Sequence, residues 1–430
     1  MTILVASTVA RWSFRTGIFL ITCLFSLLAG RVWLAARWDA TADPDLMLRA
    51  ANLEPGNADY WDRLGFYEKW NFGRRDVRRA ILYDQRATQA NPGSDTYWMD
   101  LADAYEAVGQ PARAHEAFAN AQYVHPISSD VAWRYGNYLL RQRDYPGAFA
   151  ELRRALGTDP SLTTQAIAEC SKTSDDLRSI LKQVLPDQNS YYLTALDYFL
   201  DQHQTDAALI VWDQMSTQKP AAKMEQSVPL VNELIGQERV GDALQVWRKA
   251  LETSDWPRDG GPSLVFNGGF EHDLLNGAFD WREGPVPGSA FSTDTSVVHA
   301  GSRALRITFD GSANPDFRNL QQLLSVEPGT RYHFSAYLRV DGISTDSGIR
   351  FAINDAYNNA ALQILTPDLV GSHDWSPVEA DVLTGPETHL LMITLRRLPS
   401  WKFDNRLRGT VWVDDVSLVP VSDVAKERPR

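Results

Sequence analysis

The chain has 430 residues, 44% hydrophobic and 22% charged, so it is long enough for two or three packed domains and too apolar to be mainly disordered. Its formal net charge is −12 and it has no Lys/Arg-rich run, so nucleic acid is not an expected partner. Its two cysteines, Cys23 and Cys170, exclude a disulfide framework and a cysteine-based zinc site.

The N-terminal segment, residues 1–43, contains an apolar stretch at about residues 16–36 that is long enough to cross a bilayer. Trp33 and Trp38 are suited to the headgroup region. The sequence therefore predicts a transmembrane anchor. The alternative is a cleaved signal peptide, but Leu34 is too bulky for the usual position two residues before a cleavage after Ala36. Arg11 and Arg15 at one end of the stretch are matched by Arg31 and Arg37 at the other, so charge does not set its orientation.

Residues 44–256 carry a helical pattern with a repeat of 34 residues. The clearest unit has aromatic, leucine and alanine positions in a fixed order, followed by a proline: Trp98, Leu101, Ala102, Tyr105, Ala114, Phe118, Ala121 and Pro126. Pro92, Pro126 and Pro160 stand one repeat apart. This pattern resembles the tetratricopeptide repeat, in which each unit is a hairpin of two helices.

The resemblance varies along the region. An earlier unit fits only if about three residues are inserted near residues 71–75, which predicts a longer turn between its two helices. Residues 163–186 are helical but out of phase, and residues 189–253 contain two degraded units. The resemblance implies a solenoid that binds a protein partner. The alternative is a rigid spacer, and Arg134, Tyr138 and Arg141 fit either a groove or plain solvent.

From residue 262 to about 421 the periodicity changes to the alternation of strands. Segments at 304–309, 332–339, 349–353, 391–396 and 410–414 alternate in this way, with Gly, Pro and Asp clusters between them. This pattern predicts an all-β sandwich or jelly roll. The boundary is expected at the Pro/Gly-rich stretch 256–262, and residues 422–430 are expected to be a disordered tail.

Three motifs in this domain resemble the jelly-roll carbohydrate-binding modules of glycan-degrading enzymes. They are Asn267-Gly-Gly-Phe-Glu271 with Trp281, then residues 299–307, and last Val411-Trp-Val-Asp-Asp-Val-Ser-Leu418. Trp281 and Trp412 are expected in the core. The resemblance implies that Glu271, with Asp414 or Asp415, holds a structural calcium ion; the alternative is a carboxylate that caps a turn.

Sugar binding requires exposed aromatic faces with polar groups beside them. The candidate residues lie in loop-like stretches and are Trp375, Trp401 and Tyr357, with Asn358 and Arg397. Phe403 lies in the same stretch as Trp401. For each aromatic, the alternative is a structural role.

No catalytic motif is found: there is no paired-carboxylate signal, nucleophile elbow, zinc-protease helix or phosphate-binding loop. The sequence therefore predicts a non-enzyme with a transmembrane helix, an all-α solenoid and an all-β jelly roll. We expect a membrane-anchored scaffold that binds a protein through its repeats and a glycan through its sandwich. The resemblance favours an exported body, and the order of anchor, solenoid and sandwich motivates the hypothesis of a role in exopolysaccharide export or cell-envelope assembly. The alternatives are a purely structural protein–protein assembly factor and, third, a glycan-modifying enzyme.

Overall fold

The computed structural model describes residues 8–41, 43–71, 73, 75–173, 176–218, 222–254 and 261–421. The chain divides after Pro186 into two compact units. The first contains helices α1–α10, and the second contains helices α11–α14 together with the strands. The residues at the expected domain boundary, 255–260, and the expected tail, 422–430, lie outside the described residues.

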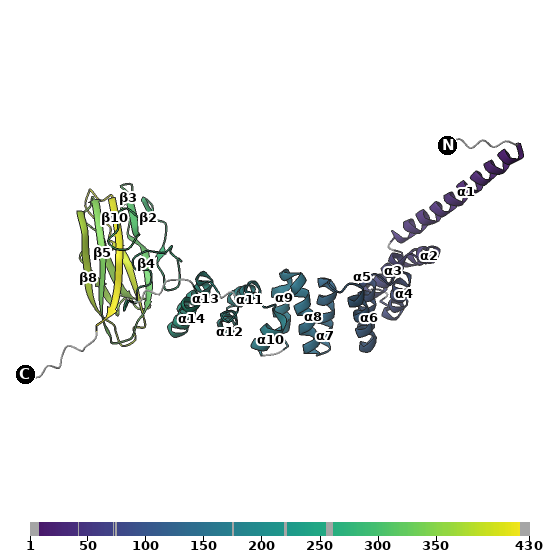
Figure 1. The fold of residues 1–430 in the computed structure, drawn as a ribbon, viewed down its shortest axis with the longest axis horizontal. Helices are drawn as coiled ribbons and strands as arrows, with labels where there is room; N and C mark the ends of the chain where they lie inside the picture. Colours follow the sequence, from purple (N-terminus) through teal and green to yellow (C-terminus); the bar gives the residue numbers. More distant parts are fainter. Residues whose placement is uncertain are drawn as a thin grey trace, which may run out of the picture. The chain divides into compact units, whose positions relative to one another are not determined.

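The first unit begins with α1 (Thr8–Asp39), followed by helices that pair in hairpins (Figure 1). They are α2 (Pro44–Leu53), α3 (Ala58–Trp70), α4 (Val77–Ala90), α5 (Asp95–Ala107), α6 (Pro111–Val124), α7 (Ser129–Arg141), α8 (Tyr145–Thr158), α9 (Thr163–Cys170) and α10 (Leu177–Val184). A short 3₁₀ turn, Pro160–Leu162, precedes α9. The predicted antiparallel pairs are therefore present as α3/α4, α5/α6 and α7/α8.

Alanines line the seams within these hairpins. Ala114 and Ala148 are fully buried, and a Cβ on Gly136 would lie 3.0 Å from the side chain of Leu152. Helices approach this closely only where the facing side chains are small. Six residues separate α3 from α4, against three between α5 and α6, so the predicted insertion is confirmed as a longer turn.

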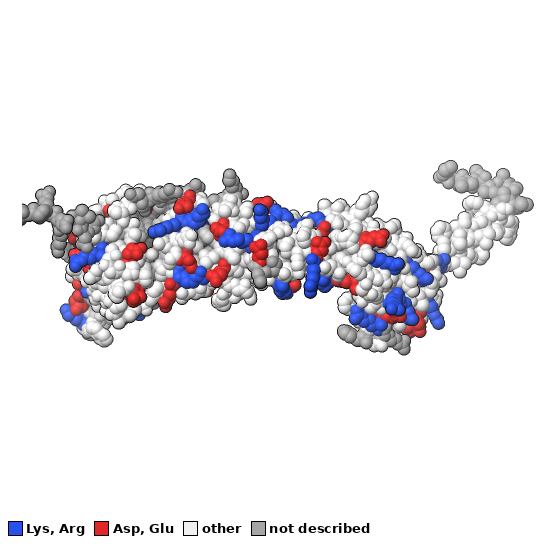
Figure 2. All heavy atoms as spheres, turned by 90° about the horizontal axis from the view of Figure 1, so that it is seen from below, with Lys and Arg blue, Asp and Glu red and all other residues white. Residues whose placement is uncertain are grey.

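The C-terminal part of α1 packs mainly on α2, whereas most of the helix is exposed. Ala35 is fully buried, and Arg31 Nε lies 2.6 Å from the Glu54 carboxylate and donates to the Leu53 carbonyl. Arg63 of α3 pairs with Asp39. Residues Arg11–Asp39 form a helix long and apolar enough to cross a membrane, a test that a signal sequence also passes. Figure 2 shows this helix almost without charged residues, whereas blue and red are interspersed over the repeats.

The second unit begins with two further helix pairs: α11 (Asn189–Asp201) with α12 (Thr205–Met215), and α13 (Met224–Gly236) with α14 (Val240–Thr253). These are the two degraded repeats that the sequence predicted. The strands follow and are β1 (Arg282–Glu283), β2 (Ser289–Asp294), β3 (Ala304–Asp310), β4 (Phe317–Ser325), β5 (Arg331–Ile343), β6 (Arg350–Asp355), β7 (Gln363–Leu365), β8 (Gly371–Leu383), β9 (Leu390–Arg397) and β10 (Arg408–Pro420).

Within the described residues the strands form two antiparallel sheets, ordered β1-β4-β9-β6-β7 and β2-β3-β10-β5-β8. Alternate side chains of both sheets, such as Phe334 and Phe351, meet in one apolar core. Trp281 is fully buried in this core and donates its indole N–H to the Asn267 carbonyl. The two packed sheets are the predicted jelly-roll type of sandwich.

Helices α13 and α14 pack directly on the sandwich. Asn232 of α13 accepts hydrogen bonds from the Ala278 backbone N–H, at 2.8 Å, and from the Arg282 guanidinium, at 2.6 Å. Trp247 of α14 packs edge-on against Phe266 and Phe279. The last predicted repeat and the sandwich therefore share an interface inside one compact unit.

Candidate functional site

The loop that follows β9 presents two aromatic side chains to solvent. Trp401 is 98% exposed and Phe403 is 105% exposed. Burial of apolar surface is the main driving force of folding, so two neighbouring aromatic rings in full contact with water do not stabilise the fold. They are available to stack against a ligand.

Arg397 fixes the base of this loop from inside the domain. Its side chain is fully buried and donates to the Asn314 side-chain oxygen at 2.6 Å and the Pro315 carbonyl at 2.9 Å. It also donates to the Asn405 carbonyl, within the loop. Burial lowers the pKa of this guanidinium, and Asp346 and Asp316 oppose the shift. This position corrects the sequence-based assignment, because a buried Arg397 holds the loop and does not reach a ligand.

Further hydrogen bonds secure the rest of the loop. The Ser400 hydroxyl donates to Asp346 at 2.5 Å, and the Lys402 ammonium lies 3.1 Å from the same carboxylate. Asn314 donates to the Ser400 carbonyl. Trp401 and Phe403 are thus carried by a loop with defined backbone contacts, which reduces the entropy lost when a ligand orders them.

Tyr357 and Asn358 lie at the opposite end of the same sheet from this loop. They follow β6, whose last residue, Asp355, pairs with Leu391 near the start of β9. The Trp401 loop follows the other end of β9, at Arg397. The Tyr357 hydroxyl donates to the Ile235 carbonyl of α13 at 2.7 Å. Burial raises its pKa to about 12. Tyr357 therefore belongs to the contact between α13 and the sandwich, and the predicted sugar-binding residues do not form one group.

Trp375 lies in β8, in the other sheet, and is half-buried. Its ring packs edge-on against His299, which stacks on Tyr337 with ring centroids 3.6 Å apart. This aromatic group is separate from the Trp401 loop in sheet and in contacts.

Trp412 also lies outside the core, contrary to the sequence-based expectation. It is buried, but by Arg306 and Arg339, each 5.7 Å from its ring, and its indole N–H donates to Asp294. It is absent from the apolar cluster between the sheets. Its position in β10 alternates with the core residues Val411 and Val413, and this alternation is the signal that could have placed it on the outer face.

The three predicted calcium ligands lie near one another. A Cβ on Gly269 would be 3.7 Å from Asp414, 3.7 Å from Glu271 and 4.0 Å from Asp415. Their oxygens already have protein donors. Glu271 accepts from the Ser302 N–H and hydroxyl and the Arg303 N–H, whereas Asp414 accepts from the His299 and Ala300 N–H groups.

These donors decide the charge state of the carboxylates. Burial raises the pKa of Glu271, but the hydrogen bonds from Ser302 and Arg303 outweigh it and the net pKa is lowered. Burial dominates for Asp414 and raises its pKa. Among the described residues no group of three His, Cys, Asp or Glu side chains is arranged to hold a metal ion. Calcium binding therefore stays a prediction, and these contacts already join the first and the last motif of the domain to the middle one, residues 299–307.

In the repeats, ion pairs link the first helices of successive hairpins. Arg134 pairs with Asp100 at 3.1 Å and Asp103 at 2.5 Å, and Arg141 pairs with Glu106 at 2.7 Å. Tyr138, left open by the sequence, is buried. The two arginines that could have lined a binding groove therefore already bind acidic groups of the preceding hairpin.

Comparisons with known proteins agree with the description of the helical repeats and of the sandwich. Residues 99–162 match the tetratricopeptide repeat family model, and residues 262–395 match a carbohydrate binding domain model. The chain thus contains tetratricopeptide repeats and a domain similar to carbohydrate-binding modules. Both module types are non-catalytic. No curated protein matches the chain.

Solved structures give similarities of the same two kinds. The structure of TmCBM61 in complex with β-1,4-galactotriose is 17% identical, with 37% of this chain and all of that chain covered, at a TM-score of 0.27. A CBM4 structure is 16% identical to this chain, with 36% of this chain and 99% of that chain covered, at a TM-score of 0.27. YrrB, a TPR protein with an unusual peptide-binding site, is 13% identical to this chain, with 49% of this chain and 93% of that chain covered, at a TM-score of 0.26.

Proposed function

We propose that this chain is a membrane-anchored, non-catalytic scaffold whose repeats bind a protein partner and whose sandwich binds a glycan. The observation that carries the glycan part is the fully exposed Trp401 and Phe403 on a loop secured by the buried Arg397. Aromatic faces of this kind stack on the C–H faces of sugar rings. Lys402 and Asp404 stand beside them in the sequence and supply polar groups.

The contacts of α1 support an anchor rather than a cleaved signal. Cleavage after Ala36 would remove Ala35, which is fully buried, and Arg31, which bonds Glu54 and Leu53. A segment that is discarded has no need of such contacts with α2, the helix that precedes the first repeat hairpin. An exported body with a role in exopolysaccharide export or envelope assembly follows from the glycan-binding proposal.

The repeats support a protein partner through the nature of their fold. Stacked helix hairpins expose a long continuous surface, and the tetratricopeptide match at residues 99–162 supports a role in protein interaction. We therefore assign protein recruitment to the repeats and glycan binding to the sandwich.

The glycan proposal is tested by retention of the full-length protein on a panel of insoluble polysaccharides, in a detergent without a sugar headgroup. We expect retention on at least one polysaccharide and its loss in Trp401→Ala/Phe403→Ala. Leu365→Ala, which removes another exposed apolar side chain of the sandwich, is the matched control and should be retained. Absence of retention on every polysaccharide, with and without calcium, would refute glycan binding.

A purely structural assembly factor is the second candidate, and the packing of α13 and α14 on the sandwich favours it. Asn232, Tyr357 and Trp247 commit one end of the sandwich to a protein contact. In that case the sandwich would serve as a folded end to the repeats. Retention by a protein partner that persists without any polysaccharide binding is the result expected of this candidate.

A further inference from the structure

A cavity lies at the edge of the sandwich, away from the Trp401 loop. It has a volume of about 270 Å³ and is bordered by β1 and β2, which are edge strands of opposite sheets, and by the loop 270–276. Phe291 and Thr293 of β2 pair with the core residues Ile307 and Leu305 of β3, so they face the space between the sheets. The cavity is the open edge of that space.

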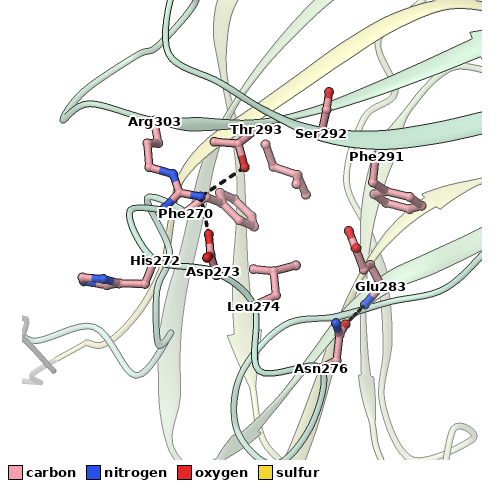
Figure 3. A pocket seen from close by; sticks show the side chains of 11 residues that line it. Phe270, His272, Asp273, Leu274, Asn276, Glu283, Phe291, Ser292, Thr293 and Arg303 are labelled. Atoms are coloured by element: carbon pink, nitrogen blue, oxygen red, sulfur yellow. Dashed lines mark hydrogen bonds and ion pairs between the residues drawn. The ribbon is translucent and has the colours of Figure 1, made fainter. Parts of the chain in front are cut away.

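The floor of the cavity is apolar and its walls are polar (Figure 3). Phe270, Leu274 and Phe291 supply the apolar part. Arg303 stands on one wall and Glu283 on the other, with Leu274 between them. This combination suits a ligand that has an apolar ring face and hydrogen-bonding groups around its rim.

The charges of the two walls differ in their availability. Arg303 is held in place by Asp273 at 2.7 Å, the Thr293 hydroxyl at 3.2 Å and the Glu271 carbonyl at 3.1 Å. Its positive charge is therefore already compensated. Within the described part of the chain, no hydrogen bond or ion pair reaches the Glu283 carboxylate, and partial burial raises its pKa.

The size and the charge together define the ligand. The cavity is slightly smaller than the range of about 300–1,000 Å³ typical of pockets for small molecules, so it admits one ring and not a run of several. An acidic ligand would meet the uncompensated Glu283, whereas hydroxyl groups would donate to it.

We propose that this cavity is a second glycan site, which binds one uncharged sugar residue at the end of a chain, with the partly exposed Phe291 against the ring and Glu283 and Arg303 on its hydroxyls. The proposal rests on the glycan-binding function proposed above and deepens it. In this proposal the exposed Trp401 loop binds along the length of a polysaccharide chain, and the cavity binds the sugar residue at a chain end.

The test uses the full-length protein in a detergent without a sugar headgroup and saturation-transfer NMR. The probes are the methyl glycosides of glucose, galactose, mannose and N-acetylglucosamine, with methyl glucuronide as the anionic counterpart. We expect saturation transfer to at least one neutral glycoside and at least tenfold weaker binding of the glucuronide. Thr293→Trp, which fills the cavity from an edge strand, should abolish the signal, and Glu283→Gln should weaken binding about tenfold.

Two matched controls accompany these variants. Thr308→Trp adds the same bulk to the neighbouring strand β3, and Glu387→Gln removes a carboxylate from an exposed loop; both should bind as the original protein does. If Thr293→Trp fails to fold, as shown by its melting temperature, Glu283→Gln decides the outcome. Unchanged binding in the cavity variants would overturn the proposal.

Polysaccharide retention of the same samples separates the two proposals. Retention without transfer to any neutral glycoside removes the cavity proposal and leaves the proposed function intact. If the original protein shows neither retention on a polysaccharide nor saturation transfer to a glycoside, both the cavity proposal and the proposed glycan-binding function are wrong. Cavity variants that lose the monosaccharide signal but keep retention through Trp401 support two separate sites.

Discussion

The helical repeats and the sandwich both bury charged groups, but for different purposes. In the repeats, Lys69 is buried between Asp84, at 3.2 Å, and the carbonyl of Asp100, at 3.1 Å, and so connects three successive helices. In the sandwich, the buried Arg397 bonds mainly to backbone and amide oxygens of loops. Buried charge therefore joins neighbouring hairpins in one region and fixes loop geometry in the other.

This difference follows from the two architectures. A repeat contacts only its neighbours, so its polar contacts act between adjacent units. The sandwich has a single core formed by strands distant in sequence, and its loops converge at the ends. We expect damage in the repeats to stay local and damage in the sandwich core to spread through the whole domain.

The largest effect is expected from Trp281→Ala in the sandwich. The change removes a fully buried indole and its hydrogen bond to Asn267, at a cost of about 3–5 kcal/mol. Hydrogen-exchange mass spectrometry should show faster exchange in all core strands and no change in α5–α8. Faster exchange restricted to the strands next to Trp281 would contradict a single cooperative core.

In the repeats, the free energy of unfolding is expected to depend on pH by an amount similar to the effect of Trp281→Ala. Burial raises the pKa of Asp84 to about 7 from an ordinary value of 3.8, against the opposing effect of Lys69. The folded state therefore holds a proton that the unfolded state releases, so the stabilising contribution of Asp84 is complete below its ordinary pKa of 3.8, falls as the pH rises from there, and is lost once the pH has passed about 7. The difference corresponds to roughly 4 kcal/mol.

The measurement is the free energy of unfolding of α3–α6 in urea, monitored by pulsed hydrogen exchange at a series of pH values from about 4 to 8, which spans the two pKa values of Asp84. Asp84→Asn should reduce the dependence. Asp62, whose pKa burial and Asp100 raise to about 7, leaves part of it in place. A stability that rises from pH 5 to 8 would have the wrong sign for this account.

Ala148→Leu tests the alanine seam with a smaller effect. The added side chain has no space between α7 and α8, so overpacking should cost about 1–3 kcal/mol. Exchange should accelerate in α7 and α8 and leave the sandwich unchanged. Ala119→Leu, on an exposed position of α6, is the matched control and should have no measurable effect.

The smallest change in stability is expected from Trp401→Ala. A fully exposed ring on a surface loop should alter the free energy of unfolding by less than about 0.5 kcal/mol, although the same ring carries the proposed glycan contact. The melting temperature of the full chain provides the measurement. A large destabilisation would show that Trp401 has a structural role.

The sequence predicted the architecture because periodicity and small-residue positions report directly on packing. The prolines at 34-residue intervals, the alanine seams and the motif around Trp281 all correspond to observed elements. Individual roles were harder to predict. Nothing in the sequence around Arg397 distinguishes a buried arginine from an exposed one, because its partners at 314–315 and 345 are distant in the chain.

The same limit explains Tyr357 and the edge cavity. Tyr357 bonds a helix more than a hundred residues away, and the cavity is assembled from two sheet edges and a loop. Local patterns identify a strand or a helix, but they do not identify which tertiary partner covers a given loop residue.

The way α1 joins the first repeat has a mechanical consequence. Arg31, Ala35 and Asp39 occupy successive turns of one helix face and contact α2, the residue that follows it and α3. The C-terminal end of α1 is therefore held against α2 and α3 by contacts along one side of the helix. If α1 spans a membrane as proposed, a rotation of α1 about its own axis would be transmitted through these contacts to α2 and α3.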